Sequence, residues 1–161
     1  MNIEPRVVRE ALEQKRSAIL KQWMTRTLQS YADQTSRFLQ EEKDPFRNPV
    51  GHVLKEGLPV LFDELLGGMD SAALTPALDG IVRIRAVQDF TASQAVAFVF
   101  LLKKIVHAEL AGEDLAALEE RIDELALLAF DLFMECREKI YEIKANEAKR
   151  RVFVMERARK E

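Results

Sequence analysis

Residues 78–110, LDGIVRIRAVQDFTASQAVAFVFLLKKIVHAEL, decide the fold of this chain. They contain the most apolar segment of the sequence, residues 95–106, in which only Lys103 and Lys104 are charged. A helix that is apolar on every side is buried over most of its surface. We therefore expect residues 95–106, with Phe98 near their middle, to form a central helix that lies under other helices or under a second subunit.

The start and the end of this central helix are marked by local signals. Thr91 or Asp89 is placed to cap its N-terminus, because a side-chain oxygen there can accept a hydrogen bond from a free backbone N–H of the first turn. Gly112 follows the last apolar residues and closes the helix. The preceding residues 78–87 are amphipathic and predict a short helix.

Helical spacing of apolar residues and the positions of proline and glycine predict the other early helices. They cover residues 5–30, residues 31–43 and residues 49–66, the last with a kink near Pro59, and residues 70–76 form a linker.

A proline-rich turn, residues 44–51, separates two of these helices. Two prolines four residues apart rule out a continuous helix. Asn48 can cap a helix whose first residue is Pro49. Phe46, just before the cap, is then expected to pack back onto the next turn.

The last helix begins near residues 113–114 and runs to about residue 159. Its apolar residues alternate three- and four-residue steps, which is the spacing of a helix-packing seam. A helix of this length outruns its neighbours, so its end is expected to project into solvent or against a partner. The seam comprises Leu118, Ile122, Leu125, Ala129, Leu132, Cys136, Ile140 and Ile143.

Length and composition limit the class of protein. The chain has 161 residues, 48% hydrophobic and 32% charged, with few glycines and no sustained strict alternation of apolar and polar residues. These values predict one globular all-α domain. The net charge of -3 argues against nucleic-acid binding. No apolar run is long enough to cross a membrane and no signal core is present, so with a single cysteine we expect a cytoplasmic protein.

A catalytic set is not found. The two histidines, His52 and His107, lie on different predicted helices and match no metal-ligand spacing, so no metal is expected. Cys136 lies on the seam of the last helix, where a buried structural thiol is favoured over a nucleophile that has no nearby base. No phosphate-binding glycine loop and no serine–histidine–aspartate cluster is present, and the sequence does not predict an enzyme.

Several residues are candidates for an interface or a ligand contact. Trp23, the only tryptophan, is interpreted as a core or interface anchor, with ligand stacking as the alternative. Arg83 and Arg85 point in different directions on a helix, and together with Gln88 they can contact an anion or a partner. The alternative is that both arginines are solvated or salt-bridged.

Two segments carry a resemblance to a known family. These are DPFRNPVG at residues 44–51 and the RIRAVQDFTASQAV core of residues 78–104. Together they resemble the RsbRD-type N-terminal sensory domain, named for co-antagonist proteins of the bacterial stressosome. The position of Trp23 also fits, and the resemblance extends to about Tyr141. We therefore divide the chain into a sensory domain, residues 1–141, and a charged extension of the last helix, residues 142–161.

The resemblance implies a single globin-like helical bundle without haem, acting in signal sensing or stress response. It implies dimerisation through the last helices and an unknown downstream protein partner, and it supplies no catalytic residues. Residues 78–87 correspond to the haem-ligand region of a globin and contain no histidine, so no cofactor is expected. The predicted function is a stand-alone sensing or adaptor domain that acts by protein contact. The alternative is a helical protein that binds a small apolar ligand or cofactor between residues 78–87 and the central helix. The candidate contacts are Trp23, Arg83, Arg85, Gln88, Phe98, Leu132, Cys136 and Ile140.

Overall fold

The computed structural model describes residues 6–31 and 33–160, and this part of the chain contains only helices and connecting turns. This confirms the predicted all-α class and the long last helix. The helices are α1 (Arg6–Gln14), α2 (Arg16–Leu28), α3 (Asp33–Glu41), α4 (Pro49–Leu66), α5 (Ser71–Val87), α6 (Ala92–Glu109) and α7 (Ala116–Ala158).

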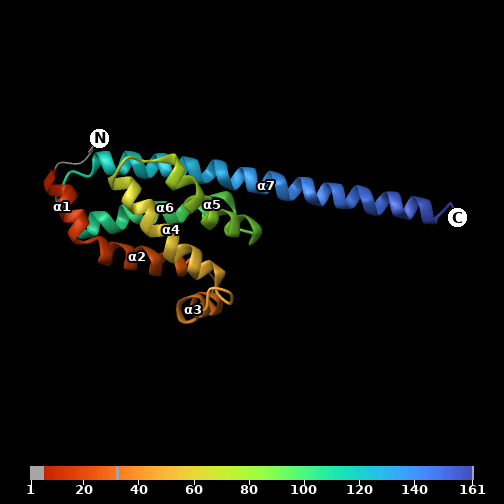
Figure 1. Ribbon diagram of the computed structural model, residues 1–161, viewed down its shortest axis with the longest axis horizontal. Coiled ribbons are helices and arrows are strands. Elements are labelled where there is room, and N and C mark those ends of the chain that lie inside the picture. The colour runs from red at the N-terminus through yellow and green to blue at the C-terminus, as the bar shows by residue number, and fades with distance from the viewer. Residues whose placement is uncertain (1–5, 32, 161) are drawn as a thin grey trace.

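Helices α2, α4, α5, α6 and the first half of α7 form the bundle, as Figure 1 shows. Helix α4 packs on α5, α6 packs on α2 and α7, and α5 also packs on α7. Helix α1 lies at one end of the bundle and α3 at the other end (Figure 1). The largest apolar side chains of the core are fully buried, and they include Trp23, Phe62, Phe98, Leu58, Leu78 and Leu102.

The central helix α6 begins as the sequence predicts. The Thr91 hydroxyl accepts a hydrogen bond from the Gln94 N–H, and the Gln94 side chain accepts one from the Thr91 N–H, which together form a capping box. Burial is less complete than expected, because the Phe100 side chain is 45% exposed while Phe98 is 1% exposed. One side of α6 is therefore open at the surface.

Two helix boundaries differ from the prediction. The first predicted helix is interrupted at Lys15, and the expected start at Pro5 lies outside the described residues. The interruption lets α1 turn across the end of the bundle and bury Leu12. The predicted linker at residues 70–76 is also helical, because Asp70 caps α5 by accepting a hydrogen bond from the Ala72 N–H. Packing of α5 against α4 and α7 compensates for the backbone hydrogen bond that Pro76 cannot donate.

The turn before α4 is confirmed in one respect and wrong in another. Asn48 caps α4, since its side-chain oxygen accepts from the Gly51 N–H at 2.8 Å, and Pro49 is the first helical residue. The Asn48 amide also donates to the Leu39 and Glu42 carbonyls. Phe46, expected to pack on the helix, is 97% exposed. The side chain that is buried in this turn is Asn48, not Phe46.

Helix α7 has 43 residues and is therefore about 65 Å long at 1.5 Å per residue. Its first half lies along the bundle, and Arg121 and Arg137 donate hydrogen bonds to carbonyls at the C-terminal ends of α4 and α5. All residues from 141 to 160 are exposed, and Figure 1 shows this part extending far beyond the other helices. The predicted projection of the last helix is confirmed.

Candidate functional site

An apolar groove lies on the open side of α6, between α6 and α7. It has a volume of about 1040 Å³, and we call it the α6–α7 groove. Phe100 of α6 and Phe130 and Leu127 of α7 line it and are 45%, 44% and 68% exposed. An ion pair of Lys103 with Asp123 at 2.5 Å joins the two helices beside it. The remaining lining residues are Thr91, Ala92, Ser93, Val96, Ala97, Leu101, Lys104 and Ala126.

The exposed apolar residues of α7 continue from this groove along one side of the helix. At 3.6 residues per turn, about 100° each, eight of them fall within roughly a quarter of the helix circumference, whereas the exposed residues Ile143, Phe153 and Val154 lie on other sides of the helix. This α7 stripe comprises Leu127, Phe130, Met134, Tyr141, Ala145, Ala148, Val152 and Met155. All eight residues are exposed. The charged residues Arg137 and Glu138 interrupt it between Met134 and Tyr141.

The seam predicted from the sequence lies on a different side of α7, about 140° away around the helix axis. Most of it packs inside this chain. Leu132 is buried, and Cys136 and Ile140 are half-buried against the core. Partial burial raises the pKa of the Cys136 thiol, which makes it a weaker nucleophile. Of the predicted seam, only Ile143 at 59% is strongly exposed.

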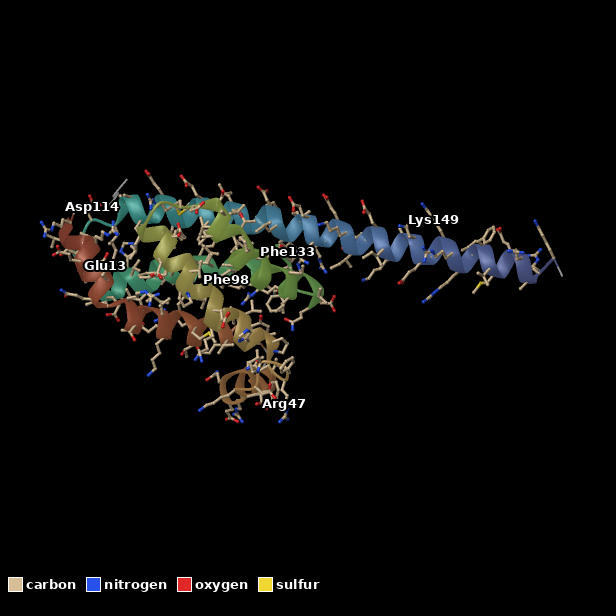
Figure 2. The ribbon with its side chains drawn as sticks, in the orientation of Figure 1. Glu13, Arg47, Phe98, Asp114, Phe133 and Lys149 are labelled. Atoms are coloured by element: carbon tan, nitrogen blue, oxygen red, sulfur yellow. The ribbon has the colours of Figure 1, made fainter. Side chains whose placement is uncertain are left out.

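Trp23 and Phe98 meet inside the bundle. The Trp23 indole donates a hydrogen bond from Nε1 to the Phe98 carbonyl oxygen at 2.7 Å, and the two rings stack with centroids 6.4 Å apart. Both side chains are buried, and Figure 2 shows Phe98 in the interior between the helices. Their placement matches the interpretation of Trp23 as a core anchor that fixes α2 to α6.

Arg85 is the unexpected member of the predicted set, because its side chain is fully buried. Its guanidinium carbon lies 5.2, 4.9 and 5.1 Å from the ring centroids of Tyr31, Phe90 and Phe98. Attraction between a cation and a ring face contributes about 0.5–2 kcal/mol. We call these three rings the Arg85 cage.

Hydrogen bonds satisfy only part of the Arg85 side chain. Nη1 donates to the Gln94 carbonyl at 3.0 Å and Nη2 donates to the Ser30 hydroxyl at 3.1 Å. Nε is buried without a partner, and no carboxylate of the described residues forms an ion pair with Arg85. Burial lowers the pKa of Arg85, and burial likewise raises the pKa of Tyr31, whose hydroxyl is beside the guanidinium. Such a buried, unpaired charge costs free energy.

Arg83 and Gln88, predicted together with Arg85, are placed elsewhere. Arg83 is exposed and pairs with Asp79 at 2.7 Å, as the salt-bridge alternative expected. Gln88 is an exposed residue at the C-terminal cap of α5. The burial of Arg85 had a detectable signal in the sequence. Arg85 shares a helix face with Leu78, Ile81 and Val82 at steps of three, four and seven residues, and that face is buried.

Residues 6–31 and 33–160 contain neither a cluster of potential metal ligands nor a helix that could span a membrane. His107 pairs with Glu119, and His52 lies 3.9 Å from Glu56 on the same helix. No group of three or more potential metal ligands occurs among the described residues. None of the described helices is both long enough and apolar enough to span a membrane.

Comparison with known proteins identifies one family. The model of the family described as the RsbT co-antagonist protein rsbRD N-terminal domain matches residues 17–148. The matched region includes α2 to α6, the buried half of α7 and the turn capped by Asn48. No curated protein and no solved structure matches the chain.

Proposed function

Because the chain belongs to the family of RsbT co-antagonist protein rsbRD N-terminal domains, we propose that it is a stressosome-related sensory or adaptor domain that acts by protein–protein contact. The observation that carries the proposal is the α7 stripe, an apolar surface that no part of the described chain covers. Exposed apolar side chains that gather on one side of a molecule mark interaction sites, whereas scattered single ones do not. Catalysis is not part of the proposal, and the described residues contain no group of three or more potential metal ligands.

The partner we propose for the stripe is a second copy of this chain, which makes the protein a homodimer through its last helices. The spacing of three and four residues in the stripe is that of a helix that packs on another helix. In the bundle, the α6–α7 groove continues the same surface, so a partner helix laid along α7 is flanked by Phe100 as well as by Phe130. A dimer of this kind buries the side chains that are exposed in one chain.

Light scattering of two charge variants tests this dimer. The paired change Leu127→Glu and Phe130→Glu places two carboxylates on the stripe, and we expect it to convert a dimeric mass into a monomeric mass. Ile143→Glu is the matched control, because Ile143 is similarly exposed but lies on the other side of α7. We expect the control to keep the dimeric mass.

Two results contradict the dimer. One is a monomeric mass for the unaltered chain at about 100 μM. A dissociation constant above that concentration means an association too weak for the proposed dimer. The other is an equal loss of mass in the control and in the stripe variant. Circular dichroism of all three proteins checks that each substitution leaves the helical content intact.

A second candidate function, binding of a small apolar ligand, is favoured by the size and lining of the α6–α7 groove. Ligand sites in proteins have volumes of about 300–1,000 Å³ and mostly apolar walls. Native mass spectrometry of the protein purified from its own host distinguishes the candidates. A bound small molecule on a monomer supports the ligand, and an unliganded dimer supports the interface.

A further inference from the structure

A second hollow lies beside the Arg85 cage, and Ala97 of α6 lines both this hollow and the α6–α7 groove. Its volume is about 460 Å³, and four of its lining residues, Ser30, Tyr31, Phe90 and Gln94, also contact Arg85. We call it the Arg85 hollow. Its other lining residues are Thr35, Gln88, Asp89 and Ala97.

Residues that accept hydrogen bonds from the guanidinium of Arg85 form part of the wall of this hollow. Nε and Nη2 form one edge of the guanidinium, and carboxylates and phosphates bind such an edge with two parallel hydrogen bonds. In this structure Nε has no partner, and Nη2 donates a hydrogen bond to the hydroxyl of Ser30, a residue that lines the hollow. The guanidinium carbon lies over all three cage rings, within 5.2 Å of each ring centroid.

The short side chain of Ser30 both accepts a hydrogen bond from Nη2 of Arg85 and lines the hollow. Ser30 is exposed, lies in the connection between α2 and α3, and donates a hydrogen bond to the Thr27 carbonyl at 2.6 Å. The two buried polar atoms without partners in the described chain, Arg85 Nε and Thr27 Oγ1, both belong to residues that Ser30 contacts. A change of the Ser30 rotamer therefore opens the edge without moving a helix.

We propose that the Arg85 hollow binds a small oxyanion, a molecule that carries a carboxylate or phosphate group, with its oxygens on Nε and Nη2 of Arg85. The bound anion supplies the counter-charge that the buried guanidinium lacks and satisfies its unpartnered Nε. The hydroxyls of Tyr31 and Thr35 and the amide of Gln88 are the polar groups available to the rest of the ligand. This site is separate from the dimer proposed above and does not depend on it.

Asp89 opposes the anion from the rim of the hollow. It is exposed, lines the hollow and has a left-handed backbone with φ 41°. A ligand that carries a hydroxyl or amino group next to its anionic group accommodates this carboxylate. A plain anion is expected to bind more weakly than such a ligand.

Titration of the full chain with sodium acetate and with sodium phosphate, at an ionic strength held constant with sodium chloride, tests the site. The fluorescence of Trp23 is one readout, because its ring stacks on Phe98 and Phe98 touches the guanidinium. The Nε–Hε signal of Arg85 in a proton–nitrogen NMR spectrum is the second. We expect both signals to change saturably and with the same half-saturation concentration, at about 1 mM or below. A dissociation constant of that size corresponds to the free energy of a few hydrogen bonds.

Four variants separate the site from general salt effects. Arg85→Met keeps the volume and removes the charge, and we expect it to abolish the saturable response. Arg83→Met, two residues away on the exposed side of α5, is the matched control and retains it. Ser30→Ala clears the guanidinium edge and Asp89→Asn removes the opposing charge, and both are expected to tighten acetate binding by at least about 2-fold.

The proposal is overturned if the unaltered chain responds to acetate and phosphate only as it responds to chloride. It is also overturned if Arg83→Met and Arg85→Met lose the response equally, or if Arg85→Met keeps it. Where Arg85→Met does not fold, Ser30→Ala and Asp89→Asn decide the matter, since weaker or unchanged affinity in both contradicts the placement of the anion.

Discussion

At Arg85, three aromatic rings take the place that a carboxylate usually takes beside a buried arginine. The rings stabilise the cation through their faces, but they accept no hydrogen bond from Nε. Phe98 serves both sides of this arrangement, since it stacks on Trp23 and also lies against the guanidinium. Phe98 therefore links the core of the bundle to Arg85, the one buried charged residue in the described part of the chain.

Replacement of Phe98 tests the core. Phe98→Ala is expected to lower the free energy of unfolding by about 3–5 kcal/mol, because the ring is fully buried and its removal leaves a cavity. Phe100→Ala is the control on the same helix, and its half-exposed ring is expected to cost less than half as much. Urea unfolding followed by circular dichroism measures both. Equal losses would mean that Phe98 does not carry the core packing assigned to it.

Tyr31 gives the molecule a dependence on alkaline pH. Burial raises its pKa above the ordinary value of 10.0, and the adjacent Arg85 opposes the shift. Below about pH 10 the tyrosine is neutral in both the folded and unfolded chain, so its contribution to stability is complete. As the pH rises further, the unfolded chain ionises first and stability is lost toward the folded pKa.

Comparison of the unaltered chain with Tyr31→Phe isolates this effect, because every other titrating group is common to both. We expect the free energy of unfolding to fall more steeply between about pH 9 and pH 11 in the unaltered chain than in the variant. Parallel curves for the two proteins would show that Tyr31 does not titrate with a raised pKa.

Among the elements, α4 depends most on its cap. Asn48 is 3% exposed and joins α3, the turn and α4 through three hydrogen bonds. The cap of α5, Asp70, is exposed and makes one hydrogen bond to the helix that it caps. A side-chain N-cap is therefore expected to contribute more to the free energy of unfolding at α4 than at α5.

Substitution of the two caps measures that difference. Asn48→Ala is expected to destabilise the protein by about 2–3 kcal/mol, because it removes the cap and leaves buried backbone groups unsatisfied. Asp70→Ala is expected to cost about 1 kcal/mol or less, since water replaces the lost hydrogen bond. Thermal unfolding of both variants is the measurement, and a larger loss at Asp70 would contradict the role given to Asn48.

The whole molecule combines a closed bundle with a helix that continues beyond it. Arg121 and Arg137 attach α7 to the ends of α4 and α5, while residues 141–160 are exposed throughout. Figure 2 shows Phe133 beside the bundle and Lys149 on the projecting part. The bundle therefore does not need the projecting part for its own packing.

Removal of residues 145–161 separates folding from association. We expect the shortened chain to have a free energy of unfolding within about 1 kcal/mol of the full chain, because residues 145–160 are all exposed. We expect its dimer to be weaker, because the α7 stripe loses Ala145, Ala148, Val152 and Met155. Urea unfolding and light scattering measure the two properties.

The sequence by itself determined the helical class, the caps at Asn48 and Thr91, the long last helix and the family. These features depend on residues within one or two helical turns of each other, so periodicity and capping signals are sufficient to predict them. The tertiary structure alone decided that the seam of α7 packs inside this chain, that the first helix breaks at Lys15, and which residues surround Arg85. Each of these depends on which distant segments meet. The partners of Arg85 come from α5, α6 and the α2–α3 connection, and spacing along one helix contains no information about the other two.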